Sequence, residues 1–239
     1  MFLSRLQPKH YVSALCIVFT LLICTASLFS ITYSKSASAH QPDSYGNTAP
    51  NGGTFHGCPA QGNGGDTQLN LLKNREDTAS WRTMSFSQLA SLPYPKSALH
   101  KNMSSWSASD AAQIGRYNGH PVAVTGYLAG VSPGHPEPAN CNSKQYVDYH
   151  LYLANSPTAK DAASIVTEAT PRIRAKHPGW TLARLQLVAS RHLPVHISGW
   201  TLFDPADDGP RVGPWEIHPV MQITIQLNGV WVSLDSAKL

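Results

Sequence analysis

Charged residues are scarce in this chain, and its first 39 positions contain no acidic residue. Lys, Arg, Asp and Glu together make up 13% of the 239 residues, with 18 basic and 14 acidic side chains. Arg5, Lys9 and Lys35 lie within the acid-free segment, so the remainder of the chain is almost neutral. A domain that binds nucleic acid through its phosphates is normally basic. The charge balance therefore argues against nucleic acid as a partner.

The acid-free segment 1–39 has the three parts of a secretory signal. A basic start is followed by an apolar run over 11–31 and by small residues that place Ala37 and Ala39 before His40. This order predicts a signal peptide cleaved before His40. The apolar run also reaches the roughly 20 residues that span a bilayer, so an uncleaved N-terminal membrane anchor is the alternative. Both interpretations place the rest of the chain outside the cytoplasm, either secreted or held at the outer face of the membrane.

Cysteine is also rare after the leader, where only Cys58 and Cys141 occur. They are too far apart for a C-x-x-C metal or redox motif. In an oxidising compartment two such thiols are expected to pair. We therefore predict a Cys58–Cys141 disulfide, with two free buried cysteines as the alternative.

The exported part divides into three regions by composition. Residues 40–66 are rich in Gly, Pro and Asn and poor in aliphatic side chains, so we predict a flexible linker that buries too little apolar surface to order itself. Residues 67–118 are predicted to be a helical packing segment, and residues 119–239 a β-domain. The candidate helices of the middle region lie at 69–75, 85–92 and 107–114.

The region 119–239 alternates apolar and polar residues in the manner of half-buried strands. The predicted strands are 122–128, 146–153, 163–170, 194–203 and 215–227, and a turn at Asn228-Gly229 leads into a further strand at 230–234. One helix is predicted at 181–191, with Thr181 as its N-cap. Pro219 has no amide hydrogen, so its strand should lie at an edge or carry a bulge there.

Three strands, one helix and two strands in this order resemble the OB-fold, a five-stranded Greek-key barrel that binds oligonucleotides and oligosaccharides. The chain is thus predicted to be mainly β, with an OB-like barrel that carries one helix between strands 3 and 4 and is preceded by short helices. The resemblance implies that the second, third and fifth strands are neighbours.

Three short motifs also resemble a group of uncharacterised exported bacterial proteins. They are Glu-Ala-Thr-Pro-Arg at 168–172, Ser-Gly-Trp at 198–200 and Trp-Glu-Ile-His-Pro-Val at 215–220. This resemblance implies the same fold and compartment and carries no activity with it.

A set of five ionisable residues falls on the three strands expected to be neighbours. They are Asp148, His150, Glu168, Glu216 and His218. Within each strand the paired residues are two apart and therefore share a face. Mixed imidazole and carboxylate ligands suit zinc or manganese better than calcium. The sequence therefore predicts a divalent-metal site, with a structural polar network or a solvent-exposed strand face as the alternatives.

A second set of residues is basic and follows the third strand. Arg172, Arg174 and Lys176, near Trp180 and Trp200, predict a surface for an anionic ligand. The alternative is that the basic side chains cover the solvent side of the following helix and that both tryptophans belong to the core.

No catalytic motif in its required context accompanies these sets. The chain has no H-E-x-x-H, and Gly130–Gly134 matches the letters of G-x-S-x-G but leads into a Pro/Gly/Asn loop, not into the helix of a nucleophile elbow. Staphylococcal-nuclease-like enzymes share the barrel, but strand 122–128 lacks their carboxylates, which speaks against that activity. We therefore predict an exported or cell-surface OB-like binding or scaffolding module. Its expected partner is an extracellular ligand such as a cell-wall polymer or oligosaccharide, and membrane contact is expected only through the N-terminal segment. The alternative is a metal-dependent extracellular hydrolase that uses the His/carboxylate cluster.

Overall fold

The computed structural model describes residues 46–50, 52–206 and 211–239. They belong to one compact unit, Asp43–Leu239. The predicted signal peptide or anchor at 1–39 lies outside the described residues. Within the described part of the chain, no helix has both the length and the apolar character needed to cross a membrane.

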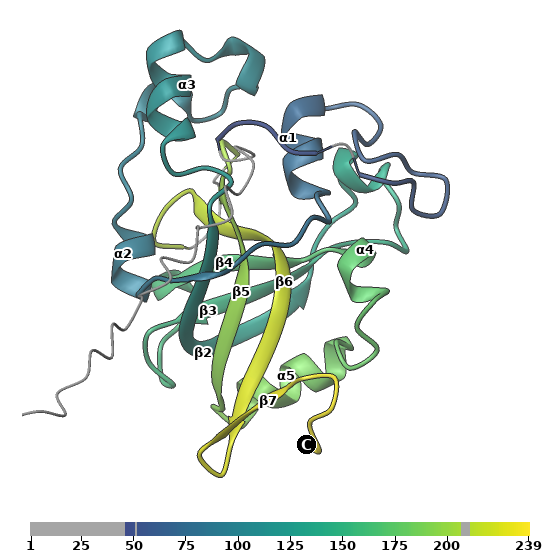
Figure 1. Ribbon diagram of the computed structural model, residues 1–239, viewed down its shortest axis with the longest axis vertical. Helices are drawn as coiled ribbons and strands as arrows, with labels where there is room; N and C mark the ends of the chain where they lie inside the picture. The colour runs from purple at the N-terminus through teal and green to yellow at the C-terminus, as the bar shows by residue number, and fades with distance from the viewer. Residues whose placement is uncertain (1–45, 51, 207–210) are drawn as a thin grey trace, which may run out of the picture. The chain divides into compact units, whose positions relative to one another are not determined.

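Five strands close into a barrel (Figure 1). These are β2 (Pro121–Pro133), β3 (Tyr149–Ala154), β4 (Ser164–Ala169), β5 (Pro194–Phe203) and β6 (Trp215–Leu227). Their order is β2-β3-β4-β6-β5, and pairing of β5 with β2 completes the ring. All neighbours are antiparallel except β4 and β6, which run parallel and pair at Thr167 and Ile217. The predicted OB-like barrel is therefore confirmed, including the neighbouring second, third and fifth strands.

Two short strands extend the barrel. Strand β1 (Arg82–Thr83) runs parallel to β2, and β7 (Val230–Ser233) returns antiparallel to β6 after the predicted Asn228-Gly229 turn. Strand β1 was not expected from the sequence, because two residues are too few to show an alternating pattern.

Short helices surround the barrel (Figure 1). They are α1 (Thr67–Lys73), α2 (Phe86–Ala90), α3 (Ala108–Gly115), α4 (Pro171–Arg174) and α5 (Leu182–Ser190), with 3₁₀ turns η1 (Lys96–Ala98), η2 (Met103–Ser105), η3 (Pro138–Asn140) and η4 (Asp161–Ala163). Helix α5 lies between the third and fourth barrel strands, as predicted. The Thr181 side chain caps it, and Leu185 and Val188 are buried in the core.

Strand β6 carries the irregularity expected at Pro219. Gly199 of β5 pairs with Val220, but Thr201 pairs with Ile217, so β6 has one more residue than β5 across this step. This bulge accommodates a residue that cannot donate a ladder hydrogen bond. Strand β3 begins at Tyr149, three residues later than predicted.

The barrel interior is apolar and continuous with the face of α5. Leu151, Ile197 and Ile223 represent the inward-facing residues of three strands, and each is at most 2% exposed. Trp180 and Trp200 are also buried in this core. They are therefore core residues, as the alternative interpretation of the basic set required, and the burial leaves neither ring free to stack on a ligand.

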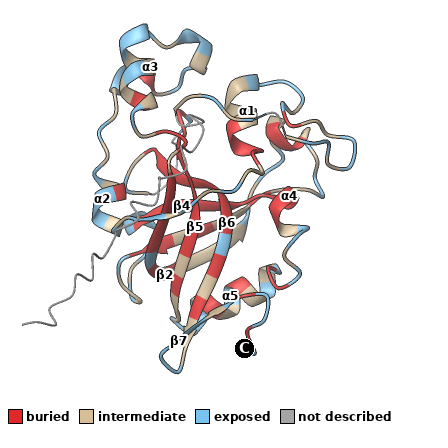
Figure 2. Ribbon diagram, viewed as in Figure 1, coloured by how far each residue is buried: buried red, intermediate tan, exposed pale blue. Residues whose placement is uncertain are grey.

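The outer face of the barrel is covered where the ionisable set lies. The first half of β6 is buried on both faces, as Figure 2 shows in red. Helix α1 contacts both β6 and the η3 turn, and so covers this part of the barrel. The alternative of a solvent-exposed strand face does not hold for β6, because Glu216 and His218 are 0% and 1% exposed. The covering segments lie far from these strands in the sequence, so strand alternation alone could not reveal them.

The segment 52–66, expected to belong to a flexible linker, is instead held on the domain. Cys58 forms the predicted disulfide with Cys141, with Cα atoms 5.8 Å apart. The buried Arg172 side chain also donates hydrogen bonds to the carbonyl oxygens of Gly53 and Cys58, each at 2.6 Å. These polar and covalent contacts replace the apolar burial that the segment lacks. The disulfide indicates an oxidising, extracytoplasmic environment.

Candidate functional site

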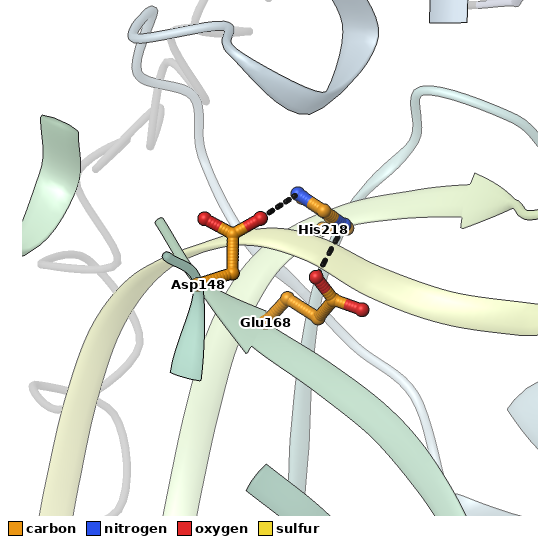
Figure 3. Close-up of side chains that lie close together, drawn as sticks. All are labelled: Asp148, Glu168 and His218. Carbon is orange, nitrogen blue, oxygen red and sulfur yellow. Dashed lines mark ion pairs between the residues drawn. The ribbon is translucent and has the colours of Figure 1, made fainter. Parts of the chain in front are cut away.

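Three predicted metal ligands meet on the outer face of the barrel. Asp148, Glu168 and His218 each offer one ligand atom, and these atoms lie within 4.8 Å of one another. His218 lies between the two carboxylates, with Nε2 3.8 Å from Asp148 Oδ2 and Nδ1 3.3 Å from Glu168 Oε2 (Figure 3).

Strand register explains why these side chains meet. The parallel pair Thr167 and Ile217 joins β4 to β6, and Glu168 and His218 are the next residue along each strand. Both side chains therefore point to the opposite face from that pair, which is the outside of the barrel. His150 of β3 lies directly opposite Glu168 in the antiparallel register.

The other two predicted ligands lie beside the triad. His150 Nε2 is 3.5 Å from Glu168 Oε1, and Glu216 Oε2 is 3.5 Å from His218 Nδ1. The structure thus brings all five predicted residues into one cluster, with Asp148, Glu168 and His218 at its centre. We call these five residues the cation cluster.

Several polar atoms of the cation cluster are buried without a hydrogen bond. They are Asp148 Oδ2, Glu216 Oε2 and both ring nitrogens of His218. Buried polar groups in folded proteins nearly always have a partner, and an unpaired one costs about 1–3 kcal/mol. Four such atoms on adjoining side chains indicate that the protein alone does not complete this site.

Further charged residues complete the surroundings and were not identified from the sequence. Lys73 of α1 lies 3.0 Å from Glu137 and 3.7 Å from Asp204, and Arg211 pairs with Glu216. Of these residues, only Lys73 has a signal in the sequence that could have suggested it. Asn70, Lys73 and Asn74 follow helical spacing and therefore share one polar face of α1. Glu137, Asp204 and Arg211 lie in connections between strands, where no periodicity marks them.

Asn140 links the loop before β3 to the cation cluster. Its amide nitrogen donates to Asp148 Oδ1 at 3.0 Å and to Glu137 Oε1 at 3.2 Å. Asn140 directly precedes Cys141, so the disulfide holds the loop that positions Asp148.

Negative charge exceeds positive charge around the cavity. It is bordered by five carboxylates, from Glu137, Asp148, Glu168, Asp204 and Glu216, and by the two permanent cations Lys73 and Arg211. When every carboxylate is ionised, the five negative charges exceed these two positive charges by three. A divalent cation would offset most of that excess.

The pKa values of the carboxyl groups respond to this excess. Burial, followed by the neighbouring Glu216 carboxylate, raises the pKa of Glu168 well above its usual range. Burial and Glu137 raise the pKa of Asp148 in the same way. Burial alone would also raise the pKa of Glu216, but the Arg211 guanidinium outweighs it and lowers that pKa to about 2. Without a metal, the cluster therefore favours protons on Asp148 and Glu168.

The positive charge of Lys73 is fixed by its neighbours. Burial tends to lower the pKa of Lys73, but the carboxylates of Glu137 and Asp204 more than offset that effect and raise the pKa well above its usual value. Lys73 therefore remains charged and holds these two carboxylates in place.

A cavity of about 480 Å³ adjoins the cation cluster. Its wall includes Asp148, His150, Glu168 and Glu216, together with Tyr152. This volume lies within the range of about 300–1,000 Å³ that is typical of ligand pockets. The cluster is thus buried on one side and borders a ligand-sized space on the other.

Arg172, the first residue of the predicted anionic-ligand set, has its guanidinium turned into the protein. It is 3% exposed and donates to Asn74 Oδ1 at 3.1 Å, besides the two carbonyl oxygens of the segment 52–66. These three hydrogen bonds go to neutral protein oxygens, and Nη1 also lies 3.6 Å from the Glu76 carboxylate.

Arg174 and Lys176 point elsewhere. Arg174 donates to two backbone carbonyl oxygens, and its guanidinium carbon lies 3.4 Å from the centre of the Tyr149 ring. Lys176 is exposed and pairs with Glu76 at 2.5 Å. The binding of an anion by this set stays a prediction, and the described contacts assign the two arginines to packing.

Comparisons with known proteins bear on the fold alone. No family profile and no curated protein matches the chain. Two solved structures are similar over part of it: "OBody AM2EP06 bound to hen egg-white lysozyme", with 16% identity and a TM-score of 0.28, and "OBody AM1L10 bound to hen egg-white lysozyme", with 18% identity and a TM-score of 0.25. The matches cover 46% of this chain and 82% and 83% of those chains, respectively. At these TM-scores the fold assignment rests on the strand order of the chain itself. That order is an OB-like barrel, and a buried His/carboxylate cluster lies on its outer face.

Proposed function

We propose that this chain is an extracytoplasmic OB-barrel protein that binds a divalent cation at the cation cluster and a ligand in the adjoining cavity. The observation that carries the proposal is the convergence of buried oxygen and nitrogen atoms of Asp148, Glu216 and His218 that make no hydrogen bond. A bound cation would satisfy carboxylate oxygens and one ring nitrogen of His218, and would offset the excess of carboxylates at the same time.

The position of the cluster supports ligand binding. OB-folds bind their ligands on the face of strands 2 and 3 and with the loops that join strands 1–2 and 4–5. Here His150 and Glu168 lie on those strands, Glu137 lies in the first loop, and Asp204 and Arg211 lie in the second. The cluster therefore occupies the face that this fold uses for recognition.

The ligand set favours zinc or manganese. Imidazole and carboxylate groups together suit these ions, whereas calcium prefers a shell of oxygen atoms. Two ligands bonded to one zinc ion at about 2.0–2.2 Å can be at most about 4.4 Å apart. The separations of 3.3 Å and 3.8 Å involve different ring nitrogens of His218, and one ion can bind only one of them. With one ligand atom taken from each of Asp148, Glu168 and His218, the atoms lie within 4.8 Å of one another, so a small side-chain shift would bring all three within that limit.

Metal content provides the first test. Protein purified without chelator is expected to carry about one zinc or manganese ion per chain, measured by plasma mass spectrometry. Glu168→Gln keeps the side-chain size but removes a negative ligand. It should lower the affinity for the metal by more than about 10–100-fold, which is the typical loss when a residue that only hydrogen-bonds to a metal ligand is changed. His218→Ala should act likewise, and Glu168→Gln serves as the variant expected to fold.

A matched control is His196→Ala. His196 lies on β5, and its Nδ1 is 2.9 Å from Thr125 Oγ1, remote from the cluster. Its loss should leave metal content unchanged. Equal, negligible metal in the wild type and all three variants would contradict the proposal.

Stability gives an independent reading. A cation present at about 100 times its dissociation constant raises the free energy of unfolding by about 2.7 kcal/mol. For a domain of this size that corresponds to a melting temperature about 5–10 °C higher. Addition of chelator should remove this increase in the wild type and have little effect on Glu168→Gln.

A metal-dependent hydrolase is the second candidate function, and the cavity favours it. A catalytic metal site keeps one position open to substrate, whereas a structural site is closed by protein ligands. The cluster borders about 480 Å³ of space. Hydrolysis of p-nitrophenyl esters, phosphodiesters and glycosides should then depend on added zinc or manganese and stop with Glu168→Gln. Metal binding without turnover of any of these leaves the binding function alone.

The proposed location follows from the disulfide and the leader. The bridge supports an oxidising compartment for the domain. We propose that residues 11–31 either direct secretion, with cleavage before His40, or remain as an anchor in the cytoplasmic membrane. N-terminal sequencing of the exported protein separates the two: a chain that starts at His40 is released, and one that retains 11–31 is anchored.

A further inference from the structure

Two more cavities continue from the cation site along helix α1. The first, of about 340 Å³, shares Lys73, Glu137 and Asp204 with the site cavity. The second, of about 570 Å³, shares Asp66 and Asn102 with the first. We call these two cavities the α1 groove. Because neighbouring cavities share walls, they lie in series from the cluster to the η2 turn.

The far part of the α1 groove is lined by uncharged hydrogen-bonding groups. It has the amides of Asn47, Gln68 and Asn102, hydroxyls that include Ser104, and the indole of Trp106. Its one charged residue is Asp66, whose carboxylate already accepts hydrogen bonds from the backbone amides of Gln68, Leu69 and Met103. This surface therefore presents no uncompensated charge to a ligand.

Trp106 is fixed in place as one wall of the groove. Its Nε1 donates to the carbonyl oxygen of Ala98 at 3.2 Å, and its ring meets Phe203 edge-on with centroids 5.6 Å apart. The side chain is half-buried, and its remaining surface borders the cavity. An indole held in this way offers a flat apolar face without further loss of side-chain entropy.

We infer that the α1 groove binds a neutral polysaccharide chain, one end of which reaches the cation site. Amide and hydroxyl groups match the many hydroxyls of a sugar, and an indole face packs against the C–H groups of a sugar ring. Cavities in series suit a polymer better than one small molecule. The inference rests on the proposed function only for the end that meets the cation, since the groove itself contains no cluster residue.

The charge of the groove disfavours a polyanion. Along its described lining the lysines and arginines are Lys73 and Lys101, beside one histidine, His100, and Lys73 is already paired with Glu137 and Asp204. A single-stranded nucleic acid needs a positively charged track for its phosphates. Such a track is missing from the described lining.

Calorimetric titration tests the inference directly. The probes are the neutral hexasaccharides chitohexaose, cellohexaose, laminarihexaose and maltohexaose, with a 20-nucleotide oligothymidylate as the polyanion. At least one hexasaccharide should bind with a dissociation constant below about 1 mM, which is still weak binding. The oligothymidylate should not bind.

Two variants locate the binding. Trp106→Ala should weaken saccharide binding about tenfold or more, because tryptophan is commonly a dominant contact in binding sites. Asn102→Ala should also weaken it, and it should fold normally, because Asn102 is exposed and its side chain makes no hydrogen bond within the described residues. The matched control is Trp231→Ala on β7, a 42% exposed tryptophan outside the groove.

The outcomes separate the two proposals. Normal metal content with no binding of any hexasaccharide overturns the groove inference and leaves the cation proposal intact. Saccharide binding that is lost in Trp106→Ala, in protein that takes up no metal, supports the groove and contradicts the cation site. Binding of the oligothymidylate that depends on Trp106, or equal weakening by Trp231→Ala, also overturns the inference.

Discussion

Removal of the Cys58–Cys141 disulfide should destabilise the domain by a predictable amount. The bridge joins residues 83 positions apart. The chain-entropy treatment of a loop of this length gives about 4.5 kcal/mol at 25 °C, because the cross-link restricts the unfolded chain. For a domain of this size, this is equivalent to a fall in melting temperature of about 9–18 °C.

Two perturbations with different side effects should give the same result. Reduction of the wild type keeps both sulfur atoms, as thiols, whereas Cys58→Ala/Cys141→Ala removes them. Both cysteines are partly exposed, so the alanine pair should not open an enclosed cavity. The Arg172 hydrogen bonds to the segment 52–66 do not depend on the sulfur atoms and should persist in both forms.

Urea unfolding followed by tryptophan fluorescence measures the effect. The oxidised wild type should be about 4.5 kcal/mol more stable than both the reduced wild type and the alanine pair. The reasoning is refuted if reduction changes the free energy of unfolding by less than about 1 kcal/mol. An alanine pair much less stable than the reduced wild type would show that contacts of the sulfur atoms matter more than the constraint.

Three further predictions concern other parts of the domain. Arg172→Lys should lower the free energy of unfolding in urea by about 3 kcal/mol or more. A lysine cannot replace the buried guanidinium, which donates to Asn74 and to two carbonyl oxygens. A loss below about 1 kcal/mol would show that these hydrogen bonds are dispensable. Gly62→Ala should cost more than Gly64→Ala, because both glycines have positive φ but a Cβ on Gly62 would lie 2.2 Å from a carbonyl oxygen, whereas Gly64 has open space; equal losses in urea unfolding would contradict the steric argument. The third prediction concerns pH: burial and then Glu216 raise the folded-state pKa of Glu168. In chelator, the contribution of Glu168 to stability should therefore be fully present below the ordinary pKa of a glutamic acid, about 4.3, and be lost as pH rises through the folded-state pKa. Glu168→Gln should lose less stability over the same rise, and parallel pH curves for the two proteins would contradict the shift.

Alternation along the strands predicted much of the barrel. Strand β6 shows why: Ile217 and Ile223 point into the core, while Glu216 and His218 point away from it, as a two-residue period requires. The helix α5 was equally clear from its Thr181 cap. Both signals are local, because each depends only on residues that are close together in the sequence.

Burial of the outer face could not be predicted from that alternation. Helix α1 contacts β6, and Asp148 of the loop before β3 lies 3.8 Å from His218, although both segments are far from β6 in the sequence. Polar residues on a strand face look the same whether water or another segment lies over them. Lys73 and Glu137 were missed for this reason, because each gains its role only from its partner.

The segment 52–66 was misjudged for a related reason. Its composition correctly showed that it has little apolar surface to bury. Its order comes instead from a covalent bond and from one buried guanidinium, Arg172, which was expected to serve an anionic ligand. Arg172 lies in the short helix α4, which begins at Pro171, and no feature of the sequence there separates these two uses.

The single parallel pairing of the barrel has a consequence for its dynamics. Strands β4 and β6 pair at Thr167 and Ile217, and Glu168 and His218 project from the residues that follow. A cation held between these two side chains would fasten the two strands across that junction. Amide hydrogen exchange in β4 and β6 should then slow on metal uptake more than in the long β2–β5 ladder, because local opening at the junction would first require release of the ion. The same few atoms would thereby govern both the occupancy of the site and the rate at which the barrel opens.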